Sequence, residues 1–459
     1  MSQHGAALGA LRNHFNSGAT RPLAYRKKVL KALRATLLAH EEELLAAMHA
    51  DMRKPRFEAY LSDIGLVLGA IDHALDQLDG WAAPKHIATP LSAQPAESTV
   101  YREPLGVVLI IAPWNYPVLL LLSPLVGAVA AGNCAVLKPS EAVPHTTAVI
   151  ARIIRTTFDP AHVLVVEGDG ATVVPALMEQ FRFDHVFFTG SARVGRSLLA
   201  IAAPQLVPVT LELGGKSPAI VDQRVDLKVA ARRIVWSKFF NAGQTCIATD
   251  HALVHSSVRE EFIHLVIQAI GTSFGEDPQQ SPHFARLVNA RQFERVKAYL
   301  AHGRVLHGGQ NDPAEHYIAP TVLGEVAADA PVMHEEIFGP VLPVIGWTEP
   351  EEVASIIQRN PYPLATYIFS NDRKRQTWFR ERIAFGGGCI NHCMLQFAPQ
   401  GMPFGGIGTS GMGRYHGRYS FDLFSHQKGI VQGSTLIDPG VQYPPYTALK
   451  EKVLRWVLR

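Results

Sequence analysis

The sequence has few cysteines and almost no charge imbalance. Its 459 residues include four cysteines at irregular spacing, and 43 basic against 40 acidic residues leave a formal charge of +3. So few cysteines do not describe a disulfide framework and fit a reducing compartment, which predicts a cytoplasmic protein. A charge this small for the length gives no indication of nucleic acid or an anionic membrane as a partner.

Signals for export, membrane insertion and metal binding are also missing. The first residues lack a basic region followed by an apolar core, so no secretory signal is expected. Residues 105–137 carry no charge over more than a membrane-spanning length, but Pro113, Pro117 and Pro124 interrupt any continuous helix. The two cysteines near residue 390 lack a second ligand pair at zinc spacing, so no metal site is predicted.

Between residues 105 and 211, buried strands alternate with helices. The run 107–111 is β-branched or aliphatic throughout, which is typical of a strand covered on both faces of a parallel sheet. Further strands are expected at 135–138, 163–166 and 185–189, and helices at 118–131, 146–157, 173–180 and 194–203. This repetition predicts a doubly wound α/β domain that binds its ligands at the carboxyl ends of the strands.

A second α/β domain is expected to begin near Glu212. Its strands are predicted at 219–221, 251–255, 341–345 and 365–369, and its helices at 227–240, from 258 onward and at 349–358. The glycine-rich segment 386–413 is predicted to be loop. Two helices at 25–48 and 57–78 precede these domains, and a short strand at 99–102 is either an edge or subunit contact or an exposed loop.

One cysteine follows a run of small and polar residues. Cys246 ends the stretch 239–246, where its thiol can sit at an accessible turn, although an isolated cysteine is usually an inert small hydrophobe. Attack of a thiolate on a carbonyl needs an oxyanion donor, typically worth ~2.7–4 kcal/mol, and the side chain of Asn115 is a candidate. Glu212 can activate water as a general base, or it is a cap or salt-bridge carboxylate before Gly214.

A turn rich in small residues follows the strand 185–189. Gly190, Ser191, Val194 and Gly195 open the next helix, so that free N–H groups and the helix dipole can face a pyrophosphate. The spacing departs from G-x-G-x-x-G, and a serine N-cap on an ordinary strand-to-helix turn has the same appearance.

Two further segments carry candidates for ribose contacts. Lys138 and Glu141 follow a strand, where they can hold ribose hydroxyls or be a surface lysine and a helix-start carboxylate. A carboxylate at 141 beside the adenosine ribose would repel a 2′-phosphate and favour NAD over NADP. Glu336 and Phe338 share one face if 335–340 is extended, which indicates a ribose contact beside an apolar surface, or a plain strand edge.

Together these motifs resemble those of the aldehyde dehydrogenases, in the same order, from about Tyr25 to Gly429. The ending 403–413, followed by Tyr415-His416-Gly417, resembles the class 3 branch. The resemblance implies an α/β fold of two doubly wound Rossmann-like domains and a small β bridging or oligomerisation unit. The expected boundaries are 1–82 with 105–211 for the dinucleotide-binding domain, 212–393 for the catalytic domain, 83–104 with 394–440 for the bridging unit, and 441–459 for a tail.

The resemblance also implies the catalytic roles. Cys246 would be the nucleophile, Asn115 and the Cys246 backbone N–H the oxyanion donors, and Glu212 the base for deacylation, with Glu336 as a rival proton acceptor. The implied reaction oxidises an aldehyde to a carboxylic acid through a thiohemiacetal and a thioester. One alternative is a CoA-acylating member, against which Glu212 argues, and another is a non-catalytic binding protein on the same fold, against which the joint presence of these groups argues.

The implied cofactor is NAD or NADP, since class 3 members commonly accept both. Glu336 would hold the nicotinamide ribose, Phe338 would line the ring and Lys138 would bind the adenosine ribose, with Leu213 in the same cofactor-binding set. Relatives of this branch are often homodimers.

The substrate funnel is expected near Tyr116, Trp236, Phe240 and the loop 396–397, which favours an apolar aldehyde, aromatic or medium-chain aliphatic. The C-terminal residues 446–459 are basic and amphipathic but too short to span a bilayer. They are expected to pack on the protein itself or on a partner subunit, with contact to a membrane surface as the alternative.

Overall fold

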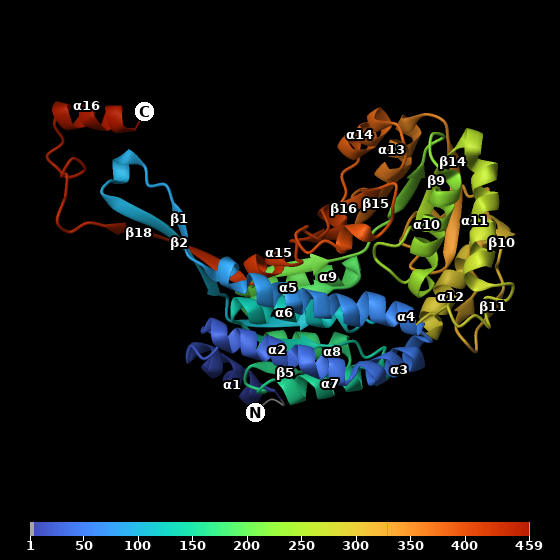
Figure 1. The fold of residues 1–459 in the computed structure, drawn as a ribbon, viewed down its shortest axis with the longest axis horizontal. Helices are drawn as coiled ribbons and strands as arrows, with labels where there is room; N and C mark the ends of the chain where they lie inside the picture. Colours follow the sequence, from blue (N-terminus) through green and yellow to red (C-terminus); the bar gives the residue numbers. More distant parts are fainter. Residues whose placement is uncertain (1–3, 328, 459) are drawn as a thin grey trace.

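The computed structural model describes residues 4–327 and 329–458. Two mostly parallel sheets form the body, and a long antiparallel arm projects from one side of it (Figure 1). The prediction of a doubly wound α/β fold is therefore confirmed.

The first sheet has six strands in the order β17-β7-β6-β3-β4-β5, and all its pairs are parallel except β17 with β7. Its strands are β3 (Val107–Ile111), β4 (Cys134–Lys138), β5 (Val163–Val165), β6 (His185–Thr189), β7 (Val209–Glu212) and β17 (Gly411–Met412). Every residue of β3, β4 and β6 is buried, as their continuous apolar sequences predict.

Helices cover this sheet and connect its strands. They are α1 (Gly5–Asn16), α2 (Leu23–Ala39), α3 (Glu41–Met52), α5 (Gly65–Ala82), α6 (Leu119–Ala131), α7 (Pro144–Thr157), α8 (Gly170–Gln180), α9 (Ala192–Ala202) and α15 (Arg418–Leu423). Helix α6 is buried at every position and passes through Pro124, and it ends at Gly132, whose φ of 98° suits glycine.

The second sheet has seven strands in the order β10-β13-β14-β9-β8-β15-β16, with β10 antiparallel to its neighbour. Its strands are β8 (Pro218–Val221), β9 (His251–His255), β10 (Arg304–His307), β13 (Thr321–Gly324), β14 (Val341–Trp347), β15 (Ala365–Phe369) and β16 (Gly387–Ile390). The surrounding helices are α10 (Leu227–Phe239), α11 (Arg259–Phe274), α12 (Ala290–Ala298), α13 (Pro350–Gln358) and α14 (Arg373–Arg382), and β11 (Asn311–Asp312) pairs with β12 (Tyr317–Ile318).

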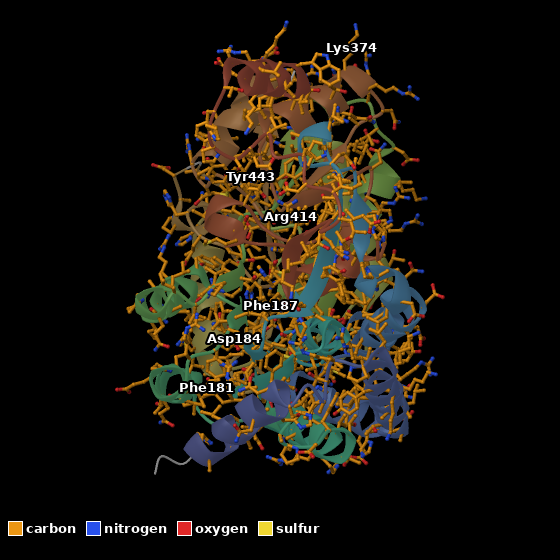
Figure 2. All side chains as sticks on the ribbon, turned by 90° about the vertical axis from the view of Figure 1, so that its left-hand side faces the viewer. Phe181, Asp184, Phe187, Lys374, Arg414 and Tyr443 are labelled. Atoms are coloured by element: carbon orange, nitrogen blue, oxygen red, sulfur yellow. The ribbon has the colours of Figure 1, made fainter. Side chains whose placement is uncertain are left out.

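The arm consists of β1 (Lys85–Ile87), β2 (Ala96–Pro104) and β18 (Ser425–Gly433), all antiparallel. The C-terminal helix α16 (Ala448–Val457) lies at its far end, near the short helix η2 (Leu91–Ala93) (Figure 1). Seen along the arm, Tyr443 of the C-terminal segment lies in front of the body, and Lys374 of α14 lies at the top (Figure 2). No helix in the described ranges is long and apolar enough to cross a bilayer.

Three predicted elements differ from the structure. The helix expected at 25–48 is two helices, because the chain breaks at His40 between α2 and α3. The helix expected at 57–78 begins as α4 (Arg56–Ala59), passes through one π-helical turn, η1 (Tyr60–Ile64), and continues as α5. Segment 386–413 is not all loop, since it contributes β16 to one sheet and β17 to the other.

Candidate active site

The loop before Cys246 has an unusual backbone. Asn241, Ala242 and Gly243 are all left-handed, with φ of 52°, 52° and 77°. For non-glycine residues this conformation costs about 1–3 kcal/mol each, so the surrounding contacts must hold it. At Gly243 a side chain is excluded, since a Cβ there would lie 2.3 Å from the carbonyl oxygen of Gly339. The sharp turn places Cys246 at the edge of a cavity, half-buried, rather than in packed core.

Asn115 lies directly beside this loop. Its side-chain Nδ2 donates to the carbonyl of Gln244 at 2.9 Å, and its own carbonyl accepts from Asn241 Nδ2 at 3.0 Å. The side chain of Gln244 fixes the loop from the other side, because its Nε2 donates to Asn241 and its Oε1 accepts from the N–H of Val288, both at 3.0 Å. The predicted oxyanion donor and the loop that leads to the nucleophile therefore belong to one hydrogen-bonded unit.

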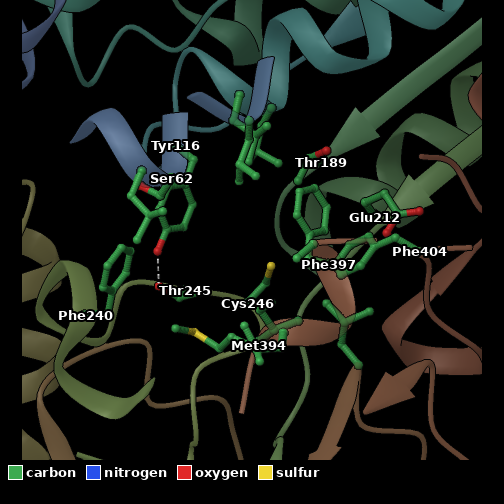
Figure 3. A pocket seen from close by; sticks show the side chains of 18 of the residues that line it. Ser62, Tyr116, Thr189, Glu212, Phe240, Thr245, Cys246, Met394, Phe397 and Phe404 are labelled. Carbon is green, nitrogen blue, oxygen red and sulfur yellow. Dashed lines mark hydrogen bonds between the residues drawn. The ribbon is translucent and has the colours of Figure 1, made fainter. Parts of the chain in front are cut away.

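A mainly apolar cavity joins the cysteine to the carboxylate. The Cys246 sulfur points into it, with Tyr116 and Phe240 to one side and Glu212 and Thr189 to the other (Figure 3). Most of its wall is aliphatic or aromatic: Leu61, Leu66, Leu119, Leu120, Leu213, Trp236, Ile247, Leu364, Met394, Leu395, Phe397, Ala398, Phe404 and Tyr415. Four of the five residues expected in the funnel line it; Gln396 does not and instead bonds to Cys389 and Tyr367.

Glu212 is the last residue of β7 and is 2% exposed. Neither carboxylate oxygen has a hydrogen-bond partner among the described residues. Burial raises the pKa of this carboxyl well above its usual range, because the charged form loses its hydration. The alternative reading of Glu212 as a cap or salt-bridge carboxylate finds no support in these contacts.

Burial also raises the pKa of the Cys246 thiol, and the carboxylates of Glu336 and Glu212 raise it further. The thiol is therefore protonated at neutral pH in this arrangement. A partner that removes the proton or adds positive charge nearby would increase its nucleophilicity.

The segment carrying Glu336 and Phe338 is not extended. The prediction that the two side chains share one face of an extended segment is therefore wrong. Phe338 has a φ of 48°, and β14 begins only at Val341. Glu336 instead faces Gly214, where a Cβ would lie 1.9 Å from its Oε2. Burial, and next the charge of Asp250, raise the pKa of Glu336 to about 8. The aromatic ring of Phe338 packs edge-on against Trp114, with centroids 5.5 Å apart.

The turn after β6 forms a capped helix N-terminus. Ser191 caps α9, accepting from the N–H of Val194 at 3.4 Å, and Gly190 joins this cap to the strand. A Cβ on Gly195 would lie 3.2 Å from the side chain of Leu213 and 3.4 Å from that of Leu211 in β7, so glycine permits close packing of helix and strand. Capping and phosphate binding are thus compatible at the same helix N-terminus.

Lys138 ends β4 and is 1% exposed. Its Nζ donates to the carbonyl of Pro139 at 2.6 Å and to Glu141 at 2.9 Å, whereas the Glu141 side chain is half exposed. The two residues form one ion pair at the carboxyl end of the sheet, which excludes the reading of Lys138 as a surface lysine.

The sequence indicated Tyr116 as a funnel residue, but it did not place Thr189 or Tyr415 in the cavity. The hydroxyl of Tyr116 hydrogen-bonds to Thr245, and the hydroxyls of Thr189 and Tyr415 are buried without a partner among the described residues. Thr189 ends strand β6, where doubly wound sheets bind ligands, so its position was a usable signal. Tyr415 offers no such signal, because it comes from the far end of the chain.

Known proteins resemble this chain throughout. A model described as the aldehyde dehydrogenase family matches residues 2–430. The chain therefore belongs to the aldehyde dehydrogenase family and is an NAD(P)-dependent oxidoreductase.

The similar proteins include family 3 members, as the class 3 resemblance predicts. Human aldehyde dehydrogenase family 3 member B1 is 41% identical over 456 residues, which cover 99% of this chain and 97% of that protein. The 4,4'-diaponeurosporen-aldehyde dehydrogenase of Staphylococcus aureus is 44% identical over 434 residues, 94% of each chain. A substrate-bound structure of S. aureus AldH superposes with a TM-score of 0.98 at 41% identity and covers all of both chains.

Proposed function

We propose that the protein oxidises an apolar aldehyde to its carboxylic acid through a covalent bond to Cys246. The observation that carries this proposal is the apolar cavity lined by both Cys246 and Glu212, with Asn115 bonded to the cysteine loop. The Cys246 thiol first loses its proton, which is the one proton released in the overall reaction, and its sulfur then bonds to the carbonyl carbon as the π electron pair moves to oxygen. The Asn115 amide and the Cys246 N–H stabilise the oxyanion of the resulting thiohemiacetal. Loss of hydride from that carbon then leaves a thioester.

Water opens the thioester in the second half of the proposed reaction. Glu212 takes a proton from the attacking water, the C–S bond breaks, and the thiol of Cys246 is restored as the acid leaves. The raised pKa of Glu212 makes it a stronger base than an ordinary carboxylate once it has lost its proton. One aldehyde, one water and one oxidised cofactor give one acid, one reduced cofactor and one proton.

The residues present fit a dinucleotide. The glycines at 195 and 214 allow Leu213 and the Glu336 carboxylate to approach closely, and the exposed Ser191 and Val194 leave the N-terminus of α9 open to a ligand. We propose that the N-terminus of α9 holds the pyrophosphate, Lys138 with Glu141 the adenosine ribose, and Glu336 the nicotinamide ribose. When bound, the nicotinamide accepts the hydride. The partly exposed Glu141 carboxylate favours NAD over NADP, and initial rates with the two cofactors test this preference.

The cavity wall supports an apolar substrate. Its polar contributions are few, mainly Ser62, Thr189, Glu212 and Thr245. Each methylene buried against such a wall contributes about 0.8 kcal/mol, so affinity should increase with apolar chain length until the cavity is filled. The S. aureus relative is named for 4,4'-diaponeurosporen-aldehyde, which supports the same class.

The test is Cys246→Ala, assayed against a panel of aromatic and medium-chain aliphatic aldehydes with NAD and with NADP. We expect no aldehyde oxidation above background by this variant, and for the parent a kcat/KM that increases with the apolar size of the aldehyde. Parent-like rates in the variant would exclude the covalent mechanism, and a preference for small hydrophilic aldehydes would exclude the substrate class.

We further propose a cytoplasmic homodimer built on the arm, with the domain boundaries given above. The four cysteines are all free, which fits a reducing compartment. Strand β18 forms one edge of the arm and is largely exposed, including Ile430 and Val431. An exposed strand edge of this length is suited to pairing with a second chain. Light scattering on the parent and on Val431→Lys tests the dimer, since the added charge should favour the monomer.

A further inference from the structure

One acidic side chain of α4 reaches the cysteine loop from outside the cavity. Glu58 Oε2 accepts from the backbone N–H of Asn241 at 2.8 Å, across 183 positions of sequence. Asn241 is the first of the three left-handed residues that lead to Cys246. The reaction described above assigns no role to Glu58.

The segment around Glu58 also fixes the loop that carries Asn115. Lys54 and Asp63 form a fully buried ion pair, with Nζ and Oδ2 2.6 Å apart, and Lys54 also donates to the carbonyl of Asn115 at 3.3 Å. Asp63 accepts from the N–H groups of Val118 and Leu119, both at 3.1 Å. Residues 54–63 therefore contact both catalytic loops.

The position of Glu58 disfavours the ionised form of its carboxyl group. Burial raises the pKa of its carboxyl to about 7, whereas the Asn241 N–H and the charge of Lys54 lower it. Carboxyl groups with strongly shifted pKa values are concentrated at functional sites. Immediately after α4, the π-helical turn η1 brings Leu61 and Ser62 into the cavity wall, and π-turns are frequent at functional sites.

We propose that Glu58 is a positioning residue for the reaction at Cys246. Its carboxylate holds the left-handed turn at Asn241. This turn keeps the thiol and the backbone N–H of Cys246 close to Asn115. This proposal depends on the covalent mechanism proposed above. Asn241 transmits the effect, because its Nδ2 donates to the carbonyls of both Asn115 and Gln244, at 3.0 and 3.3 Å. If the N–H of Asn241 loses its acceptor, the Asn115 amide and the Cys246 N–H can move apart.

The test compares Glu58→Met, which keeps the volume and removes the acceptor, with Glu58→Gln, which keeps an acceptor oxygen. The rate constant of the pre-steady-state hydride burst is measured at saturating aldehyde and cofactor, together with cofactor Kd and Tm. We expect the burst to slow by about tenfold in Glu58→Met, equivalent to about 1.4 kcal/mol, and to return to within about twofold of the parent in Glu58→Gln. The cofactor Kd should stay the same in both variants. Glu42→Gln is the matched control, since Glu42 pairs with Arg56 of α4 on the surface.

The role of Glu58 would be overturned by a parent-like burst in Glu58→Met, or by a burst in Glu58→Gln as slow as in Glu58→Met. A parallel loss of Tm, cofactor affinity and burst rate in both variants would show a merely structural residue. If Glu58→Met does not fold, Glu58→Asp takes its place, because its shorter side chain falls short of Asn241. Absence of cofactor reduction by the parent protein with every aldehyde of the panel would instead count against the proposed function itself.

Discussion

At Gly214, the addition of a single methyl group should weaken cofactor binding while leaving the free energy of unfolding nearly unchanged. A Cβ there would lie 1.9 Å from Oε2 and 2.6 Å from Cδ of Glu336. Both atoms belong to the end of a flexible side chain, so the clash is relieved when the carboxylate moves. The backbone φ of Gly214 lies outside the left-handed region, and alanine can therefore adopt it.

The backbone of Glu336 cannot follow its side chain. Arg295 donates to the carbonyls of Glu336 and Ile337 at 3.0 and 2.8 Å, and Asp250 accepts from the N–H of Ile337 at 2.8 Å. In Gly214→Ala the carboxyl group alone is displaced. Above about pH 8, where Glu336 is ionised, this would remove the proposed charged hydrogen bond to the ribose, worth about 1.5–3 kcal/mol. Cofactor affinity should fall by roughly 10- to 150-fold, since about 1.4 kcal/mol is a factor of ten. The free energy of unfolding should change by less than about 1 kcal/mol.

Calorimetric titration with NAD measures the first quantity and denaturant unfolding the second. Gly69→Ala is the control, because a Cβ at Gly69 in α5 would meet no atom within 4 Å. In a Glu336→Ala background, adding Gly214→Ala should weaken NAD binding no further, since both changes remove the same contact. A parent-like Kd in Gly214→Ala would refute the assignment of Glu336 to the ribose.

Two other predictions follow from the buried acids. Glu212→Gln should keep the hydride burst while steady-state turnover falls by about 10²–10⁴-fold, because only the opening of the thioester needs the base; a normal steady state would remove Glu212 from that role. Burial and the carboxylates of Glu336 and Glu212 raise the pKa of the Cys246 thiol, so its thiolate fraction increases with pH throughout the neutral range. Alkylation of Cys246 by iodoacetamide, followed by mass spectrometry, should accelerate about tenfold per pH unit from about pH 6 to about pH 9, and a plateau below about pH 8 would contradict the raised pKa.

The buried parallel strands were predictable, because uninterrupted β-branched and aliphatic runs have few other uses in a globular chain. The run 107–111 coincides with β3, and 185–189 with β6. Strand β18 escaped prediction because it is polar and exposed, and its partner β2 lies more than 300 residues earlier. The division into domains at the stated boundaries remains a prediction, although β17 joins 411–412 to the six-stranded sheet, within a segment assigned to the bridging unit.

The site shows the same contrast between local and long-range information. Cys246 and Glu212 stand in recognisable local motifs, and both line one cavity. The contact of Glu58 with Asn241 leaves no local trace, because any acid on a surface helix has the same appearance in the sequence. The left-handed turn at Phe338 was equally invisible, since phenylalanine has no preference for that conformation.

The pairing of β17 with β7 also determines the order in which the cavity can be completed during synthesis. Gly411 pairs with Glu212, and the N–H of Leu213 bonds to the carbonyl of Ser410 at 3.1 Å. Phe404 and Tyr415 close the same wall. A nascent chain that already displays Cys246 must therefore extend by about 170 residues before this wall exists. At about 5–20 residues per second, the thiol spends on the order of ten seconds or more outside the finished cavity, an interval in which an electrophile can modify it without catalysis.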